Sequence, residues 1–389
     1  MKKMIPLSVP NFEGNEEEYV LKAVKEGWVS TGGAAIDELE KKLAEFACVP
    51  AVAACQSGTA ALHLSLIEAG VKPEMHVIVP TLTFIAAVNP VKYQYAEPVF
   101  MDCDDSLCMD AGKLRRFCEE ECELSKEGLR YKRTGKLIKA IVVVHVFGNL
   151  ADMEAIMDIA EEFRLCVIED ATEALGSYFT AGRYKGCMAG TIGDFGAYSF
   201  NGNKIITTGG GGAVTARDEK KLAHIKYLST QAKDDGLYYI HNEIGYNYRM
   251  TNLQAALGVA QMEKLPEFIR RKNKNYEIYQ SNLEGLEAGK LLSFREDIYS
   301  NKWFYSLVLD KGKVKKSIRE IIKALSEQGI QTRPIWGLIH EQLPYRDCPA
   351  YKIEKATYYS ERIINLPCST NITEEDIRYV CDTVKGLLD

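Results

Sequence analysis

The sequence has no apolar run long enough to cross a membrane and no excess of positive charge. Its first residues, MKKMIPLSVPNFEGNEEEY, include two lysines but lack the apolar core that a signal peptide needs. The formal net charge is −6 at pH 7, whereas nucleic-acid-binding domains usually present a basic face. We therefore expect a cytoplasmic protein that binds neither membranes nor nucleic acids.

The sequence also lacks the cysteine pattern of a disulfide framework or a zinc site. Its eleven cysteines are odd in number and scattered through apolar segments, which is typical of reduced thiols. One cluster, Cys103, Cys108, Cys118 and Cys122, has the spacings C-x4-C, C-x9-C and C-x3-C, and no C-x2-C pair. Cys118 and Cys122 would share one face of a helix. A metal site is the alternative, but the spacing favours structural cysteines, and we predict no metal.

The length of 389 residues predicts two domains. In residues 1–250, short apolar runs alternate with helical patterns: AVAAC with SGTAALHLSLIEAG, HVIVP with TFIAAVNPVKYQ, and IVVVHVF with ADMEAIMDIAEEF, followed by LCVIED. This alternation predicts a large α/β domain with a mostly parallel sheet covered on both faces. The polar segment LSKEGLRYKRTGK, residues 124–136, is expected to be a solvated hairpin or loop inserted in it.

The pattern changes after residue 250. Thr251 and Gln254 have the spacing of a capping box, and Pro266 is expected to begin a second helix, so residues 251–284 are predicted to be linking helices. Residues 285–389 predict a smaller α+β domain with a strand at WFYSLVLD and a helix at SIREIIKALSEQ. That helix is expected to be capped by Ser317 and Glu320 and to end before Gly329.

Polar residues follow the predicted strands, and ligands of parallel sheets bind where the strands end. Gly58 and Thr59 begin a helix whose free N–H groups could bind an anion, although Ser57 could equally be a simple N-cap. Asp170 ends an apolar strand, where it is either a functional carboxylate or an N-cap. Lys204 lies in GAYSFNGNKIITTGGGGAV, whose order of lysine and glycines is not that of a phosphate-binding P-loop.

Together these residues match the needs of pyridoxal phosphate. The cofactor requires an anion site for its phosphate, a carboxylate for its ring nitrogen, an amine for covalent attachment and a flat side chain against its ring. Phe84 could supply the flat side chain. The aromatic and aliphatic neighbours of Lys204 predict partial burial, which favours a nucleophilic amine over an ordinary solvated lysine.

Seven blocks of the sequence, in this order, resemble the DegT/StrS family of nucleotide-sugar aminotransferases. They are SGTAALHLSL, VPTLTFIAAVN, HVFGNLADMEAI, IEDATEALGS, IGDFGAYSFNGNK, TTGGGGAV and GYNYRMTNLQAALG. The resemblance implies the fold type I, aspartate aminotransferase-like architecture with a sheet of the seven-stranded type. It implies that Lys204 binds the cofactor covalently and moves protons, that Asp170 pairs with the ring nitrogen and that Phe84 stacks on the ring. It also implies that Gly58, Thr59 and Ser199 hold the phosphate.

Further implications concern the partner subunit and the substrate. Asn247 corresponds to a residue that reaches the phosphate of the neighbouring subunit, so a homodimer with shared active sites is expected. Two positions depart from the family pattern: Glu173, near the 3'-hydroxyl side of the cofactor, is commonly glutamine, and Gly210 replaces an acidic residue of the usual TTGEGG. These departures resemble the branch that aminates C4 of UDP-linked 4-keto-6-deoxy-N-acetylhexosamines with glutamate as donor.

Alternatives remain open at this point. One is a GDP-4-keto-6-deoxymannose aminotransferase of the perosamine-forming type, and another is a non-catalytic regulatory or binding protein with the same fold. A related sugar 3-dehydratase is disfavoured, because that branch replaces the lysine with histidine. Candidate contacts to the nucleotide sugar are Ser30, Thr31, His145, Tyr248, Arg249, Arg333 and His340, each of which could instead have a structural role.

Overall fold

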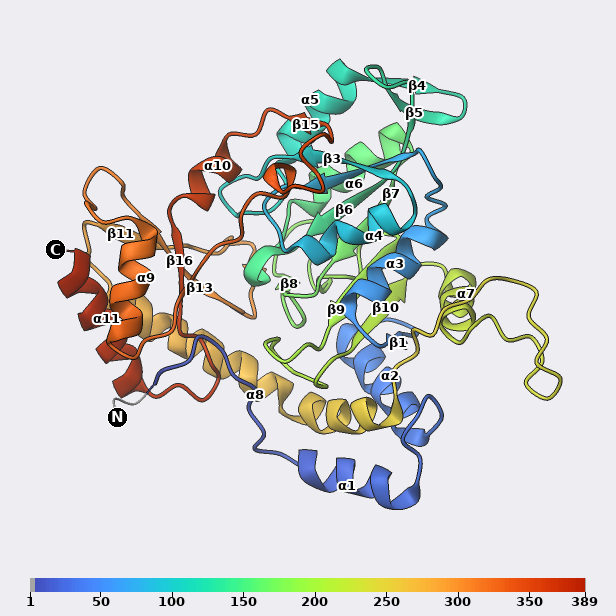
Figure 1. The fold of residues 1–389 in the computed structure, drawn as a ribbon, viewed down its shortest axis with the longest axis horizontal. Coiled ribbons are helices and arrows are strands. Elements are labelled where there is room, and N and C mark those ends of the chain that lie inside the picture. Colours follow the sequence, from blue (N-terminus) through green and yellow to red (C-terminus); the bar gives the residue numbers. More distant parts are fainter. Residues whose placement is uncertain (1–3, 389) are drawn as a thin grey trace.

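The computed structural model describes residues 4–388 as a large sheet with surrounding helices, a smaller sheet beside it, and one long helix connecting the two regions (Figure 1). None of the helices within this range has the length and apolar character needed to cross a membrane.

The large sheet forms the core of the fold. Its strands follow the order β1 (Ala53–Cys55), β10 (Gly212–Ala216), β9 (Phe195–Ser199), β7 (Cys166–Asp170), β6 (Leu137–Val144), β2 (His76–Pro80), β3 (Glu97–Met101) and β15 (Ala350–Tyr351). From β9 to β15 neighbouring strands are parallel, whereas β1 and β10 pair antiparallel. Consecutive residues of β2 and β7 are buried, as expected for strands covered on both faces. The predicted mostly parallel sheet is confirmed.

The sheet topology brings the polar strand ends together. Parallel strands β6, β7 and β9 all end at one edge, at Val144, Asp170 and Ser199 respectively. Antiparallel β10 begins at the same edge, because Gly212 pairs with Ser199. The loop that carries Lys204 joins β9 to β10 and is therefore held at this edge.

Several helices pack around the sheet: α2 (Ala34–Ala47), α3 (Gly58–Glu68), α4 (Asn89–Tyr93), α5 (Ala111–Glu121), α6 (Met153–Phe163) and α7 (Glu219–Ser229). Helix α1 (Glu16–Glu26) packs instead against the long connecting helix. Helix α3 contacts β9 and β10 and is buried along almost its whole length. Ser57 caps it, since its side chain accepts a hydrogen bond from the Ala60 N–H at 3.0 Å. The buried position of α3 fixes its N-terminus at the edge of the sheet where β6, β7 and β9 end.

The expected pair of linking helices is a single helix, α8 (Asn252–Asn282), with Pro266 in its interior. The predicted capping box of Thr251 and Gln254 is confirmed at its start. Proline removes one helical hydrogen bond at a substantial cost, but buried Leu265 and Phe268 anchor the helix on both sides of it. The prediction that a helix begins at Pro266 was wrong, because tertiary packing outweighs the local preference of proline. Figure 1 shows α8 running from the large sheet to the smaller one.

The C-terminal part forms an antiparallel sheet in the order β11 (Gly289–Leu291), β13 (Tyr305–Leu309), β16 (Ile363–Leu366) and β14 (Arg333–Pro334). Helix α9 (Ile318–Glu327) has the predicted Ser317–Glu320 capping box, and Gly329 follows with φ +80°. Helix α11 (Glu374–Leu388) contacts α9 and α8. The predicted α+β character of this region is confirmed.

Two segments cross between these regions. Ile5 bridges Ile330, so the N-terminal segment pairs with the C-terminal part, and β15 adds residues 350–351 to the large sheet. The division into residues 1–250, 251–284 and 285–389 stays a prediction. A short two-stranded sheet of β8 (Tyr178–Phe179) and β12 (Ile298–Tyr299) also joins distant parts of the chain.

The polar segment 124–136 belongs to a hairpin of β4 (Cys122–Ser125) and β5 (Gly128–Tyr131), and β5 continues onto β6. Cys103, Cys108, Cys118 and Cys122 are free thiols buried in the core. Burial raises the pKa of the Cys108 and Cys122 thiols to about 12, so these side chains remain protonated at neutral pH.

Candidate active site

A cavity of about 390 Å³ lies at the edge where β6, β7 and β9 end. Seven of the cofactor-binding residues predicted from the sequence line it: Gly58, Thr59, Phe84, Asp170, Glu173, Ser199 and Lys204. They come from five separate segments of the chain, which the sheet topology brings to one place.

Lys204 lies in the loop between β9 and β10 with only 12% of its side chain exposed. Its Nζ is 3.7 Å from Glu173 Oε1 and 4.1 Å from the centroid of the Trp303 ring. The Lys204 N–H donates to the Asn201 carbonyl at 3.0 Å, which fixes the backbone of the loop. The amine therefore points into the cavity between an acidic group and an aromatic face.

Asp170 ends β7 and is 3% exposed. Its Oδ1 accepts a hydrogen bond from the Thr172 N–H at 3.1 Å. Burial raises the pKa of the Asp170 carboxyl above its usual value. The hydrogen bonds from Thr172 and the positive charge of Lys204 act to lower this pKa, but their effect is smaller. A buried carboxylate of this kind is stabilised by a cationic or proton-donating partner in the cavity.

Glu173 is the second buried carboxyl of the cavity. Its Oε2 accepts a hydrogen bond from the Phe147 N–H at 2.9 Å. Burial raises the pKa of Glu173 to about 7, although the charge of Lys204 and the Phe147 hydrogen bond both act to lower it. The Glu173 carboxyl can therefore exchange a proton near neutral pH.

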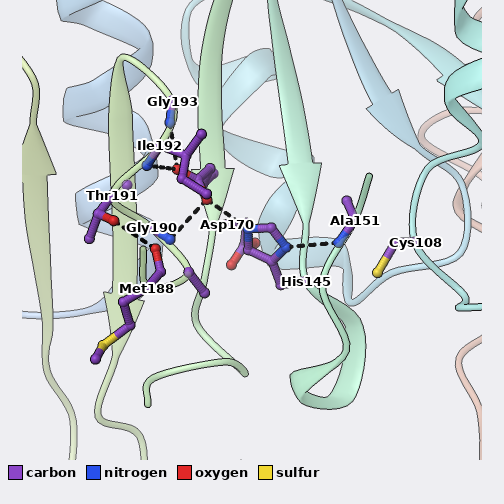
Figure 2. Close-up of polar contacts among 12 residues, drawn as sticks. Cys108, His145, Ala151, Asp170, Met188, Gly190, Thr191, Ile192 and Gly193 are labelled. Atoms are coloured by element: carbon purple, nitrogen blue, oxygen red, sulfur yellow. Dashed lines mark hydrogen bonds and ion pairs between the residues drawn. The ribbon is translucent and has the colours of Figure 1, made fainter. Parts of the chain in front are cut away.

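Glu169, next to Asp170 in the chain, anchors the end of β7. Its Oε1 accepts hydrogen bonds from the N–H groups of Ile192 and Gly193, both at 2.6 Å. Its Oε2 accepts a hydrogen bond from the Gly190 N–H at 2.9 Å and contacts His145 Nε2 at 2.8 Å. Figure 2 shows His145 lying between this segment and Ala151.

His145 has a structural environment instead of the predicted contact with the nucleotide sugar. It is fully buried, and its Nδ1 accepts a hydrogen bond from the Ala151 N–H at 3.2 Å (Figure 2). Because Nδ1 accepts a hydrogen bond, Nε2 carries the ring N–H and donates a hydrogen bond to the Glu169 carboxylate. Both ring nitrogens are occupied within the protein, so the structure does not support His145 as a substrate contact.

The start of α3 packs directly against Ser199 and Thr172. A Cβ atom at Gly58 would lie 2.9 Å from Ser199 Cβ and 3.0 Å from Thr172 Cγ2. Glycine thus permits the first helical turn, whose N–H groups have no intrahelical acceptors, to approach these side chains. This arrangement provides a site for an anion such as phosphate.

Phe84 precedes a short 3-10 helix, η1 (Ile85–Ala87), and its side chain is 55% exposed beside the cavity. The helix predicted over TFIAAVNPVKYQ is divided into η1 and α4. An exposed aromatic ring at the mouth of a cavity is available to stack on a flat ligand.

The sequence did not identify the aromatic wall on the other side of the cavity. Trp303, Phe304 and Trp336 line it, and Phe147 lies behind, with its ring centroid 4.8 Å from that of Trp336. These tryptophans lie at least 99 residues from Lys204 in the chain, and no local motif marks them. The sequence feature that could have indicated them is that two of the three tryptophans of the chain lie in its C-terminal part.

The remaining predicted substrate residues lie outside the lining of this cavity: Ser30, Thr31, Tyr248, Arg249, Arg333 and His340. Arg249 is buried and forms an ion pair with Glu40, so its predicted contact with a diphosphate is not supported by the structure. His340 Nδ1 lies 2.6 Å from Thr81 Oγ1, and the Tyr248 hydroxyl lies 3.2 Å from His63 Nδ1.

Ser30, Thr31 and Arg333 are exposed on the surface. Asn247 is also exposed and does not line the cavity; its Oδ1 accepts a hydrogen bond from Gln231 Nε2 at 3.3 Å. The expected contribution of Asn247 to a neighbouring subunit stays a prediction.

The donor set of the cavity fits pyridoxal phosphate. The N-terminus of α3 with Ser199 would hold the phosphate, Asp170 the ring nitrogen, and Phe84 one face of the ring, while the Lys204 amine is positioned for covalent attachment. The Gly58 contacts agree with this fit, since a side chain there would collide with Ser199 and Thr172 at the start of α3. Within residues 4–388, no cluster of three histidine, cysteine or acidic side chains is arranged to bind a metal ion.

Comparisons with known proteins show the family of the chain. The model of the DegT/DnrJ/EryC1/StrS aminotransferase family matches residues 10–385. The GDP-perosamine synthase of Escherichia coli O157:H7 is 36% identical over 385 residues, covering 98% of this chain and 98% of that protein.

A second relative is the UDP-4-amino-4,6-dideoxy-N-acetyl-beta-L-altrosamine transaminase of Campylobacter jejuni subsp. jejuni serotype O:23/36 (strain 81-176). It is 27% identical over 389 residues, covering 99% of this chain and 98% of that protein. Among solved structures, the PLP form of Spr1654 from Streptococcus pneumoniae, a proposed sugar aminotransferase, has a TM-score of 0.87. It is 25% identical, covering 99% of this chain and 98% of that one.

Proposed function

Because the chain belongs to the DegT/DnrJ/EryC1/StrS aminotransferase family, we propose that it aminates C4 of the nucleotide sugar UDP-2-acetamido-2,6-dideoxy-hexos-4-ulose. It is a pyridoxal phosphate-dependent sugar aminotransferase with the fold type I architecture. Glutamate is the proposed amino donor, and the products are the 4-amino sugar nucleotide and 2-oxoglutarate. The observation that carries the proposal is that Lys204, Asp170 and the N-terminus of α3 line one cavity.

Each residue has a proposed role that its environment supports. Pyridoxal phosphate, when bound, accepts the electrons left on a carbon that loses its proton. The Asp170 carboxylate holds the proton on the ring nitrogen, which maintains this electron-accepting capacity. Lys204 binds the cofactor covalently at rest and, once released, takes the proton from the α-carbon of glutamate.

In the second half of the reaction, Lys204 returns a proton to C4 of the sugar. This role requires an amine close to the reacting carbon and shielded from bulk water. The small exposure of Lys204 and its contact with Glu173 support both requirements.

Gly210 supports the UDP-sugar branch. It lines the cavity, and a Cβ atom there would have no neighbour closer than Gln254 Nε2 at 3.7 Å. Gln254 Nε2 instead donates to the Gly210 carbonyl at 2.6 Å. A Cβ atom at the position where the family pattern has an acidic side chain would therefore make ordinary van der Waals contacts, and Gly210 contributes no negative charge to the cavity.

GDP-4-keto-6-deoxymannose is the second candidate substrate. The identity to the E. coli GDP-perosamine synthase, 36%, exceeds the 27% to the C. jejuni UDP-sugar transaminase. The two candidates differ in the base and in the substituent at C2, so direct assays separate them.

A homodimer with shared active sites is also proposed. The loop before Asn247 exposes four large apolar side chains, Leu237, Tyr238, Tyr239 and Ile244, each at least 73% accessible. Such a cluster is typical of a protein–protein contact. A second copy of the chain would cover these side chains and bring Asn247 to the phosphate of the neighbouring site.

The substrate assay uses the purified enzyme, first converted with glutamate to its amino form and freed of glutamate. UDP-2-acetamido-2,6-dideoxy-hexos-4-ulose should restore the absorbance of the pyridoxal form and yield the 4-amino sugar. Restoration by GDP-4-keto-6-deoxymannose alone would replace the proposed substrate with the second candidate. No restoration by either sugar would contradict both.

A further inference from the structure

The indole of Trp303 faces the amine of Lys204. The Nζ atom lies 4.1 Å from the ring centroid, which is within the range of a cation–π contact. Trp303 immediately precedes Phe304 and β13 and thus belongs to the C-terminal part of the chain, whereas Lys204 belongs to the large sheet region. The contact therefore joins the two parts of the molecule at the reacting group.

Four hydrogen bonds hold Trp303 in place. Its backbone N–H is shared between the Phe147 carbonyl at 3.1 Å and Asn301 Oδ1 at 3.0 Å. Its indole Nε1 donates to the Asn203 carbonyl, next to Lys204, at 2.8 Å. Its carbonyl accepts a hydrogen bond from Lys272 Nζ at 2.5 Å. The ring is thus fixed against Lys204 and cannot turn away without breaking a buried hydrogen bond.

Two carboxyl groups lie near the same amine. Glu173 Oε1 lies 3.7 Å from Lys204 Nζ, and Asp170 interacts with Lys204 electrostatically. The two carboxyl groups and the negative face of the indole favour the protonated amine.

We infer that Trp303 is a positioning residue that stabilises the protonated form of Lys204 whenever its amine is not bonded to the cofactor. The inference rests on the proposed role of Lys204. When Lys204 accepts the α-proton of glutamate, its lone pair forms the new N–H bond, and the electrons of the broken C–H bond stay with the carbon, delocalised into the cofactor. The ring of Trp303 stabilises the resulting ammonium, but only the neutral amine can accept the next proton.

The same contact affects covalent capture of the cofactor. Only the neutral amine attacks a carbonyl carbon, so stabilising the ammonium slows attachment of added pyridoxal phosphate to the apoprotein. Weakening the contact should therefore accelerate capture, and proton transfer, which needs the same neutral amine, should shift in the same direction. A purely structural role for Trp303 would not make the rate of capture depend on the electron density of the indole.

The experiment uses tryptophan fluorination, which weakens the negative face of the indole while preserving its shape and its Nε1 donor. The chain has three tryptophans, so Trp28→Phe and Trp336→Phe leave Trp303 as the only indole. Capture is measured in the apoprotein as growth of the visible absorbance after addition of pyridoxal phosphate. Proton transfer is measured in the holoenzyme as exchange of the glutamate α-hydrogen with solvent deuterium.

With increasing fluorination of Trp303, we expect capture to become faster by about 2- to 30-fold in total and exchange to shift in the same direction. The matched control carries Trp303→Phe and Trp336→Phe and retains only Trp28, which lies outside the lining of the cavity; fluorination there should leave both rates unchanged. Trp303→Phe, compared with Trp303→Leu in otherwise wild-type chains, gives an independent series in which the ring variant should lie closer to the wild type.

A rate of capture that stays unchanged or falls with fluorination of Trp303 would overturn the inference while visible absorbance still develops. If no visible absorbance develops even in the wild-type apoprotein, the covalent role of Lys204 itself is wrong, and the proposed function fails with it.

Discussion

At the scale of single residues, Glu173 combines burial, a backbone hydrogen bond and a close lysine. Burial raises its pKa to about 7 in the folded protein, whereas an unfolded chain ionises at the usual value near 4.5. The folded state therefore retains a proton that the unfolded state loses as the pH rises between these values. The contribution of Glu173 to stability is complete below about pH 4.5 and is lost as the pH rises through 7.

Glu173→Gln should remove this pH dependence. Between pH 5 and pH 8, the wild-type apoprotein should lose about 2–3 kcal/mol of unfolding free energy relative to the variant. Urea unfolding at the two pH values measures the difference, with the exposed Glu26→Gln as a control. If the difference in unfolding free energy between wild type and Glu173→Gln were the same at pH 5 and pH 8, this result would contradict the assigned ionisation.

The sequence predicted those site residues that follow strands, because the end of an apolar run also marks the edge of a parallel sheet. Asp170 follows this rule, whereas the role of Ser199 was implied by the family resemblance and that of Lys204 was inferred from its apolar neighbours. Two of the seven nucleotide-sugar candidates, His145 and Arg249, have their polar atoms occupied by Glu169 and Glu40. Residue type and strand position do not distinguish a side chain that faces the cavity from one that faces the core.

At the scale of elements, the N-terminus of α3 depends on the absence of a side chain at Gly58. Gly58→Ala would place Cβ within 3.0 Å of Ser199 and Thr172 side-chain atoms. Overpacking of this kind costs about 1–3 kcal/mol of folding stability, and the displacement it forces on the first turn of α3 should weaken the binding of pyridoxal phosphate.

The matched control for this prediction is Gly202→Ala in the Lys204 loop, where a Cβ atom meets nothing within 4 Å. Equilibrium titration of each apoprotein with pyridoxal phosphate measures the affinity. An affinity of Gly58→Ala equal to that of the control would show that α3 does not approach the phosphate closely.

Helix α8 shows where local sequence signals fail. The Thr251 capping box correctly marked its start, because the capping hydrogen bonds are made within four residues. Pro266 did not end it, since buried neighbours on either side compensate the missing hydrogen bond. The aromatic wall of Trp303 and Trp336 was missed for a related reason: long-range packing, not a local pattern, brings it to the cavity.

At the scale of the whole molecule, each active site is proposed to need two chains. A dimer of one Lys204→Ala chain and one Asn247→Ala chain would then contain one site with both residues intact and one with neither. Random mixing of the two variants forms such dimers in half of the cases, so about a quarter of wild-type activity should return.

The activity of each variant alone gives the baseline for this mixing experiment. Subunits are exchanged by dilution and reconcentration, and the dimer fraction is followed by analytical ultracentrifugation. Mixed samples whose activity remains the mean of the separate variants would contradict a contribution of Asn247 to the neighbouring site.

The central claim is that Lys204 binds the cofactor covalently, and borohydride reduction tests it most directly. Reduction of the holoenzyme fixes pyridoxal phosphate to the nitrogen that holds it, and peptide mass spectrometry then identifies the modified residue. We predict that the label lies on Lys204 and that Lys204→Ala carries none. A label on another lysine of the wild-type enzyme, or an equally labelled Lys204→Ala variant, would contradict the account.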